Sequence, residues 1–212
     1  MPVLIHDEDI SDALIADRQA TGLDRYDEVW NGVYVVSPLA NVEHQDLVMA
    51  LSGAIMMAWD LKGLGRTQPG ANVSDRRTGW TSNYRIPDVL CFSSKSPALD
   101  CDTHWCGGPE FAIEITSRGD RMIEKLDFYA LVGTQEVLVL DRNPWKLSLY
   151  RVEDDGKSMS EFAVSDPTST GWVQSRIVPV RFRLDFPASL LRIEESSGRV
   201  LREIAFETVR TK

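Results

Sequence analysis

A carboxylate in the middle of an apolar strand constrains this chain more than any other sequence feature. The segment Glu110–Thr116 alternates so that three large apolar side chains share one face, while Glu114 lies on the other. A charged carboxylate among apolar residues is unfavourable unless it binds a cation or pairs with a basic group. Glu114 therefore predicts either a metal site or a buried ion pair, with Arg118 or Arg121 as the partner.

The segments around this strand alternate between strand and helix patterns. Strands are expected at 26–30, 33–36, 86–92, 110–116, 137–141 and 145–152, and helices at 8–20, 43–59 and 120–131. Asn31-Gly32 predicts a tight hairpin between the first two strands, and Asn41 and Asp120 are the expected caps of the later helices. After residue 152 we expect a solvated turn, further strand between 176 and 190, and a short apolar tail.

The third helix is expected to bury four side chains. These are Met122, Ile123, Leu126 and Ala130. Together the patterns predict an α/β fold in one domain over residues 1–212, with its core at about 24–190, a short N-terminal helix and a C-terminal tail.

The charge is unevenly distributed along the chain. The net charge of −9 argues against a protein that coats nucleic acid non-specifically. Residues 1–30 carry eight acidic and two basic side chains, whereas residues 61–95 carry six basic and two acidic ones. A local basic lip that contacts phosphates is expected at Arg76, Arg77, Arg85, Arg118 and Arg121. The alternative is a set of scattered, solvated side chains.

Composition also excludes several classes. No stretch is long and apolar enough to cross a bilayer, and the first residues lack the basic-then-apolar order of a secretion signal, so we expect a cytosolic protein with reduced thiols. The spacing of Cys91, Cys101, His104 and Cys106 fits no zinc-knuckle pattern. There is no serine elbow, phosphate-binding glycine loop or paired-histidine zinc helix.

Three residues that are far apart in the sequence form the main candidate site. Asp88 follows Pro87 at a strand, Glu114 lies in the next strand, and Lys125 lies in the helix after it. Two carboxylates on neighbouring strands, with the carbonyl of Ile115 as a third ligand, suit a hard cation such as Mg²⁺ or Mn²⁺. Lys125 would orient a water molecule or stabilise charge. We expect such a site to hydrolyse phosphodiesters.

Four further residues are candidates for the same site. They are Glu28, His44, Thr116 and Tyr129. Structural alternatives remain for three of them: a solvated strand residue for Glu28, a structural hydrogen-bonding group for His44, and simple packing for Tyr129.

The order of these motifs resembles one family. The motifs are Pro87-Asp88, Glu114-Ile115-Thr116-Ser117, Asp120, Lys125-Leu126, Tyr129, Gly133 and the strand at 136–141. Together with Glu28-Val29-Trp30-Asn31-Gly32 and Glu43-His44-Gln45, they resemble the Uma-two family of candidate restriction endonucleases in the PD-(D/E)XK nuclease superfamily. The resemblance covers residues 24–152 well and the C-terminal part loosely.

The resemblance implies a restriction-endonuclease-like mixed β-sheet flanked by helices, magnesium or manganese as cofactor, and Asp88, Glu114 and Lys125 as catalytic residues. Thr116 departs from the superfamily pattern, because it stands where the third motif usually has lysine. Threonine cannot replace an ammonium electrostatically. The resemblance implies that the lysine has moved to the following helix, where Lys125 fits.

The leading expectation is an endonuclease that cuts DNA by magnesium-assisted attack of water. The alternative is a catalytically inactive nuclease-fold module that binds nucleic acid or a protein partner, which Thr116 and the acidic net charge favour. RNA remains open as a substrate. By analogy with enzymes that cut both strands of a duplex, we also expect a homodimer.

Overall fold

The centre of the molecule is a six-stranded mixed sheet. The computed structural model describes residues 8–37, 39–117 and 119–207. The strands run in the order β12 (Met159–Ser165), β11 (Trp145–Val152), β10 (Glu136–Arg142), β9 (Phe111–Thr116), β6 (Val89–Ser93) and β3 (Gly65–Pro69). Strands β9 and β10 are parallel, and every other neighbouring pair is antiparallel. The predicted mixed α/β architecture is confirmed.

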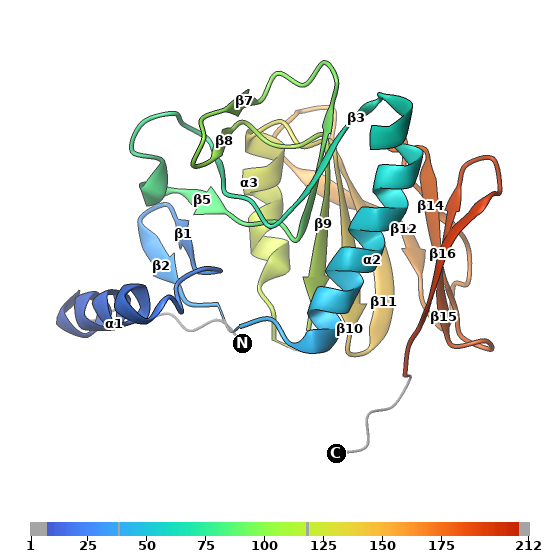
Figure 1. Ribbon diagram of the computed structural model, residues 1–212, viewed down its shortest axis with the longest axis horizontal. Coiled ribbons are helices and arrows are strands. Elements are labelled where there is room, and N and C mark those ends of the chain that lie inside the picture. The colour runs from blue at the N-terminus through green and yellow to red at the C-terminus, as the bar shows by residue number, and fades with distance from the viewer. Residues whose placement is uncertain (1–7, 38, 118, 208–212) are drawn as a thin grey trace.

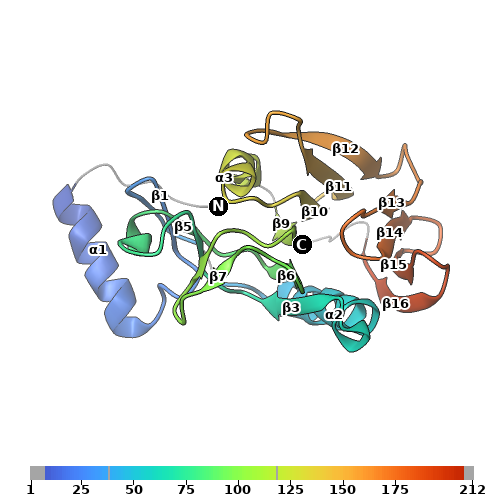
Figure 2. The same cartoon turned by 90° about the horizontal axis from the view of Figure 1, so that it is seen from above.

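Both faces of this sheet are covered. Helix α2 (Val42–Ala58) packs on one face, and the short helix α3 (Leu126–Leu131) covers the other (Figures 1 and 2). Asn41 caps α2 as expected, because its side chain accepts a hydrogen bond from the backbone N–H of His44. The α2 face also carries a second, four-stranded sheet of β13 (Val173–Gln174), β14 (Val180–Asp185), β15 (Leu190–Glu195) and β16 (Val200–Ala205).

A third sheet lies beside the central one and carries the predicted hairpin. Its order is β2 (Val33–Val35), β1 (Glu28–Trp30), β5 (Tyr84–Arg85), β4 (Val73–Ser74), β8 (Trp105–Cys106) and β7 (Leu99–Asp100). Asn31 and Gly32 both have positive φ, 51° and 87°, as a tight hairpin turn requires. The remaining elements are α1 (Glu8–Thr21) and the 3₁₀ helices η1 (Asp60–Lys62), η2 (Trp80–Ser82) and η3 (Met122–Lys125).

The alternation predicted for β9 is observed and decides where Glu114 points. Phe111, Ile113 and Ile115 belong to the core beneath α2, whereas Ala112 packs with α3. Glu114 has the same parity as Ala112 and therefore points towards α3. Among the described residues, no helix is long and apolar enough to span a membrane.

Three sequence-based expectations were wrong in detail. The strand expected at 86–92 begins only at Val89, because Pro87 has no N–H to donate to a neighbouring strand. The helix expected at 120–131 begins as η3, whose cap position is Arg121 without a side-chain bond, so Asp120 is not a cap. The tighter 3₁₀ turn changes the phase of the side chains, and Ile123 is 60% exposed instead of buried.

The C-terminal part is more ordered than the expected apolar tail. Strands β15 and β16 extend beyond residue 190 and complete the four-stranded sheet. Leu191, Ile193 and Phe206 are buried in the same core as α2. The hydrophobic core therefore reaches beyond the predicted boundary.

Candidate active site

Strand pairing brings Asp88 next to Glu114. The antiparallel register pairs Val89 with Ile113, so Asp88, one residue before β6, lies across from Glu114. The Asp88 carboxylate accepts a hydrogen bond of 2.7 Å from the backbone N–H of Ile115, where β6 no longer supplies a partner. The two predicted carboxylates thus meet at one end of the sheet.

Lys125 reaches the same place from η3. Its Nζ donates to Glu114 Oε1 at 3.1 Å and to Glu28 Oε1 at 2.9 Å. Tyr129, one turn later, donates its hydroxyl to Glu114 Oε1. Glu28, Glu114 and Tyr129 are buried, and the Lys125 side chain is 12% exposed. Packing alone therefore does not describe Tyr129, because its hydroxyl fixes the carboxylate of Glu114.

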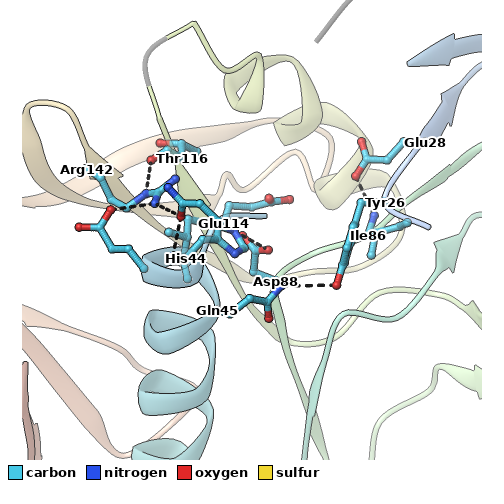
Figure 3. A network of polar contacts seen from close by, with 12 residues as sticks. Tyr26, Glu28, His44, Gln45, Ile86, Asp88, Glu114, Thr116 and Arg142 are labelled. Carbon is cyan, nitrogen blue, oxygen red and sulfur yellow. Dashed lines mark hydrogen bonds and ion pairs between the residues drawn. The ribbon is translucent and has the colours of Figure 1, made fainter. Parts of the chain in front are cut away.

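Both carboxylate oxygens of Glu28 accept hydrogen bonds. Besides the bond from Lys125, Glu28 accepts from the backbone N–H of Ile86 at 2.8 Å and from Trp30 Nε1 at 2.7 Å. The hairpin places this carboxylate at the site although Glu28 is remote in sequence from Lys125 (Figure 3 shows it entering from the hairpin side). The solvated-strand alternative is wrong for Glu28, which is only 2% exposed.

Burial and like charges shift the pKa values of this cluster. Loss of solvent raises the pKa of Glu114 to about 8; Lys125 opposes this effect, and the charges of Asp88 and Glu28 add to it. Burial likewise raises the pKa of Asp120. The pKa of Lys125 lies above its usual value because the attraction of Glu114, Glu28 and Asp120 outweighs desolvation. Lys125 is therefore an ammonium at neutral pH.

His44 contacts the other predicted carboxylate. Its Nε2 lies 3.1 Å from Asp88 Oδ1, while its buried Nδ1 has no hydrogen-bond partner. Figure 3 shows His44, Asp88 and Glu114 gathered near the first turn of α2. Thr116 is buried on β9, and its carbonyl accepts a 3.3 Å hydrogen bond from Arg142. Thr116 lies beyond Glu114 on the same face of β9. The ammonium that contacts Glu114 belongs to Lys125.

These residues surround a pocket of about 220 Å³, called the active-site pocket below. Its lining includes Glu28, His44, Asp88, Glu114, Ile115, Asp120, Arg121, Lys125 and Arg142. Asp120 and Arg142 were not predicted as site residues. Arg142 bonds Asn41 at 3.0 Å and Glu43 at 3.1 Å and so links the end of β10 to α2. No local sequence motif indicates the long-range contact of Arg142. Asp120, in contrast, could have been predicted as a site residue, because it stands among the family motifs.

The predicted arginines do not form one surface. Arg121 lines the pocket and bonds Glu124 at 2.7 Å, whereas Arg76 and Arg77 are exposed on a loop outside it, and Arg76 pairs with Asp75. Arg85 is 3% exposed and donates to the carbonyl of Val29 at 2.9 Å. Its predicted phosphate contact is therefore wrong, because its guanidinium is used inside the fold. Arg118 lies outside the described residues.

The donor set suits an open magnesium site. Among the described residues, no three His, Cys, Asp or Glu side chains are placed to hold a metal ion together, and the cysteines are free, so an ion here would depend on two carboxylates. Magnesium takes one or two carboxylates and keeps water and phosphate as its other ligands. Glu114 Oε2 has only a 3.3 Å contact with Lys125, and Asp88 lies opposite, so two oxygen donors face the pocket. The Ile115 carbonyl remains a predicted third ligand.

Comparisons with known proteins identify a family and a similar fold. The sequence matches the model of the Uma2 family, described as "Putative restriction endonuclease", over residues 18–186. The fold resembles the crystal structure of "a putative nuclease belonging to DUF820" from Anabaena variabilis, with a TM-score of 0.54, 17% identity, and coverage of 70% of this chain and 80% of that chain. Among curated proteins, none matches significantly. Because the family model covers most of the chain, this protein belongs to the Uma2 family, whose description and fold support a nuclease.

Proposed function

We propose that this chain is a magnesium-dependent endonuclease that hydrolyses phosphodiester bonds in DNA. The observation that carries the proposal is the contact of one buried ammonium, Lys125, with Glu28 and Glu114, beside the carboxylate of Asp88. Such perturbed, buried ionisable groups in a pocket are typical of catalytic sites. Family membership and the nuclease-like fold support the same reaction class.

The charge of the pocket supports a divalent cofactor. Four acidic side chains line it, those of Glu28, Asp88, Glu114 and Asp120. A bound cation would favour the ionised form of Glu114, whose pKa burial raises. Lys125 contacts two of the four, whereas Arg121 and Arg142 pair with other acidic residues, Glu124 and Glu43. Asp88, Glu114 and the Ile115 carbonyl would hold the ion. When bound, magnesium offsets the charge of the phosphate and makes a water molecule more acidic.

Hydrolysis joins a water oxygen to phosphorus and breaks one P–O ester bond, so negative charge grows on the phosphate and on the leaving oxygen. Lys125 remains protonated and therefore acts by donating hydrogen bonds and by its charge, not as a base. Glu28 is a positioning residue, since its three donors hold it against Lys125. Tyr129 fixes Glu114, and His44 fixes Asp88.

Cleavage of labelled DNA with Mg²⁺ or Mn²⁺ tests this proposal. We expect cleavage by the wild type, none by Glu114→Gln or Asp88→Asn, and unchanged cleavage by Glu161→Gln, which alters an exposed glutamate on β12. Manganese binding provides a second readout and should be lost in Asp88→Ala. If wild type and Glu114→Gln are equally inactive on every DNA topology while both bind nucleic acid without metal, the inactive-module alternative replaces the enzyme.

A further inference from the structure

A second cavity continues from the active-site pocket on the far side of Asp88. It has a volume of about 700 Å³ and is called the side groove below. It shares Tyr26, His44, Ile86 and Asp88 with the active-site pocket, so the two cavities meet at Asp88. Its other walls come from the first turns of α2, from β3 with the loop after it, and from the loop before β8.

The charge of the side groove does not favour binding of a phosphate backbone. Its lining carries two arginines, Arg25 and Arg66, against three aspartates, Asp88, Asp100 and Asp102. Arg66 is also within 3.7 Å of Asp100. The affinity of proteins for duplex DNA comes largely from basic residues on phosphates, and this surface has no such excess. A neutral part of the nucleic acid is the better occupant.

The polar groups of the side groove suit the edges of nucleobases. Three side-chain amides line it, those of Gln45, Gln68 and Asn72. Gln68 Oε1 accepts from Trp105 Nε1 at 3.0 Å and Asn72 donates to the Thr103 carbonyl at 3.0 Å, which leaves the Gln68 amide N–H groups and the Asn72 oxygen for a base. Gln45 is exposed, and its contact with the Tyr26 hydroxyl is long, at 3.4 Å (Figure 3). The Gln45 amide is thus free to exchange this weak bond for one to a base.

A stacking surface lies in the same groove. The exposed Arg66 guanidinium lies over the ring of Trp105 at 5.5 Å, and Trp105 in turn stacks on Phe92 with ring centroids 4.0 Å apart. Unpaired bases stack on arginine planes and aromatic rings in this way. Bases inside an intact duplex present neither their faces nor their pairing edges.

We infer that the side groove binds an unpaired nucleobase next to the phosphodiester held at Asp88. The inference rests on the proposed function and specifies its substrate: single-stranded or locally unpaired DNA, in preference to an intact duplex. The base hydrogen-bonds to the amides and stacks at Arg66, while its phosphate reaches past Asp88 into the active-site pocket.

Fluorescence anisotropy without divalent metal tests the groove itself. We expect the wild type to bind a labelled single strand about tenfold more tightly than the blunt duplex of the same sequence, since one stacked base is worth about that factor. Gln45→Trp fills the groove and should raise the Kd of the single strand about tenfold. Met49→Trp is the matched control, because Met49 is 74% exposed on the same helix and lies outside the groove. Its Kd should stay that of the wild type.

A second pair of variants tests the same groove without introducing a tryptophan. Arg66→Ala should weaken single-strand binding, whereas Arg202→Ala, which removes the same charge from an exposed position on β16 outside the groove, should not. Equal binding of single strand and duplex, or equal effects of the groove and control variants, would overturn the inference.

Cleavage with magnesium separates the two proposals. Faster cutting of a duplex with a central unpaired bubble than of the fully paired duplex supports the groove. Metal-dependent cleavage without that preference would refute base binding in the side groove and would still support the endonuclease. If the protein binds single strands preferentially without metal but cleaves no DNA, the side groove is supported as a binding site and the endonuclease proposal is refuted.

Discussion

Replacing Lys125 by methionine should destabilise the protein strongly, because it removes the ammonium between two buried carboxylates. The side chains of Lys125, Glu28 and Glu114 are 12%, 3% and 6% exposed. Removing one partner from a buried ion pair costs about 3–5 kcal/mol, whereas an exposed pair contributes about 1 kcal/mol at most. We expect the lower value, about 3 kcal/mol, since the raised pKa of Glu114 keeps this carboxyl largely protonated at neutral pH and leaves Glu28 as the main uncompensated charge.

Urea unfolding measures this loss as a lower midpoint at unchanged slope. Lys146→Met is the matched control, because the Lys146–Glu161 pair spans 3.0 Å with both side chains 38% exposed. The double variant Lys125→Met/Glu28→Gln should recover part of the stability, since it removes the Glu28 carboxylate that Lys125 no longer compensates. If Lys125→Met unfolds at the midpoint of Lys146→Met, the buried network does not contribute as argued.

Three further predictions concern the same region. The pKa of Glu114 rises from 4.5 to about 8 on folding, so the unfolding free energy of the wild type should fall with rising pH across this window relative to Glu114→Gln; parallel pH profiles would refute the shift. Tyr129→Phe should lose about 1.5 kcal/mol with its hydrogen bond to a buried carboxylate, and an unchanged urea midpoint would contradict the contact. Asn41→Ala should cost about 1 kcal/mol as a lost cap of α2, visible as a lower melting temperature; no change would show that the cap is dispensable.

The elements with strong local signals could be predicted from the sequence. The Asn31-Gly32 hairpin, the Asn41 cap and the alternation of β9 are set by backbone conformation and by the period of the apolar residues, which act over a few positions. The four-stranded C-terminal sheet could not be predicted in the same way. Its strands are stabilised by packing on α2, a contact between segments distant in sequence.

The same division applies to the site. Glu114 could be found because a carboxylate in an apolar strand needs a partner. The described partners are Lys125 and Tyr129, whereas Arg121 bonds Glu124 instead. Arg85 shows the opposite failure, since a basic residue in a basic stretch reads as surface although it is buried. Arg142 reaches the pocket only through the parallel pairing of β9 and β10, which no local pattern reveals.

The most direct test of the account is anomalous diffraction from a crystal soaked in manganese. We expect one strong anomalous peak in the active-site pocket, from an ion bound by Asp88 and Glu114, and its loss in crystals of Asp88→Ala. A pocket without a peak at saturating manganese, or an ion held by other residues while Asp88 and Glu114 remain uncoordinated, would contradict the claim that these two strands build a metal-dependent nuclease centre.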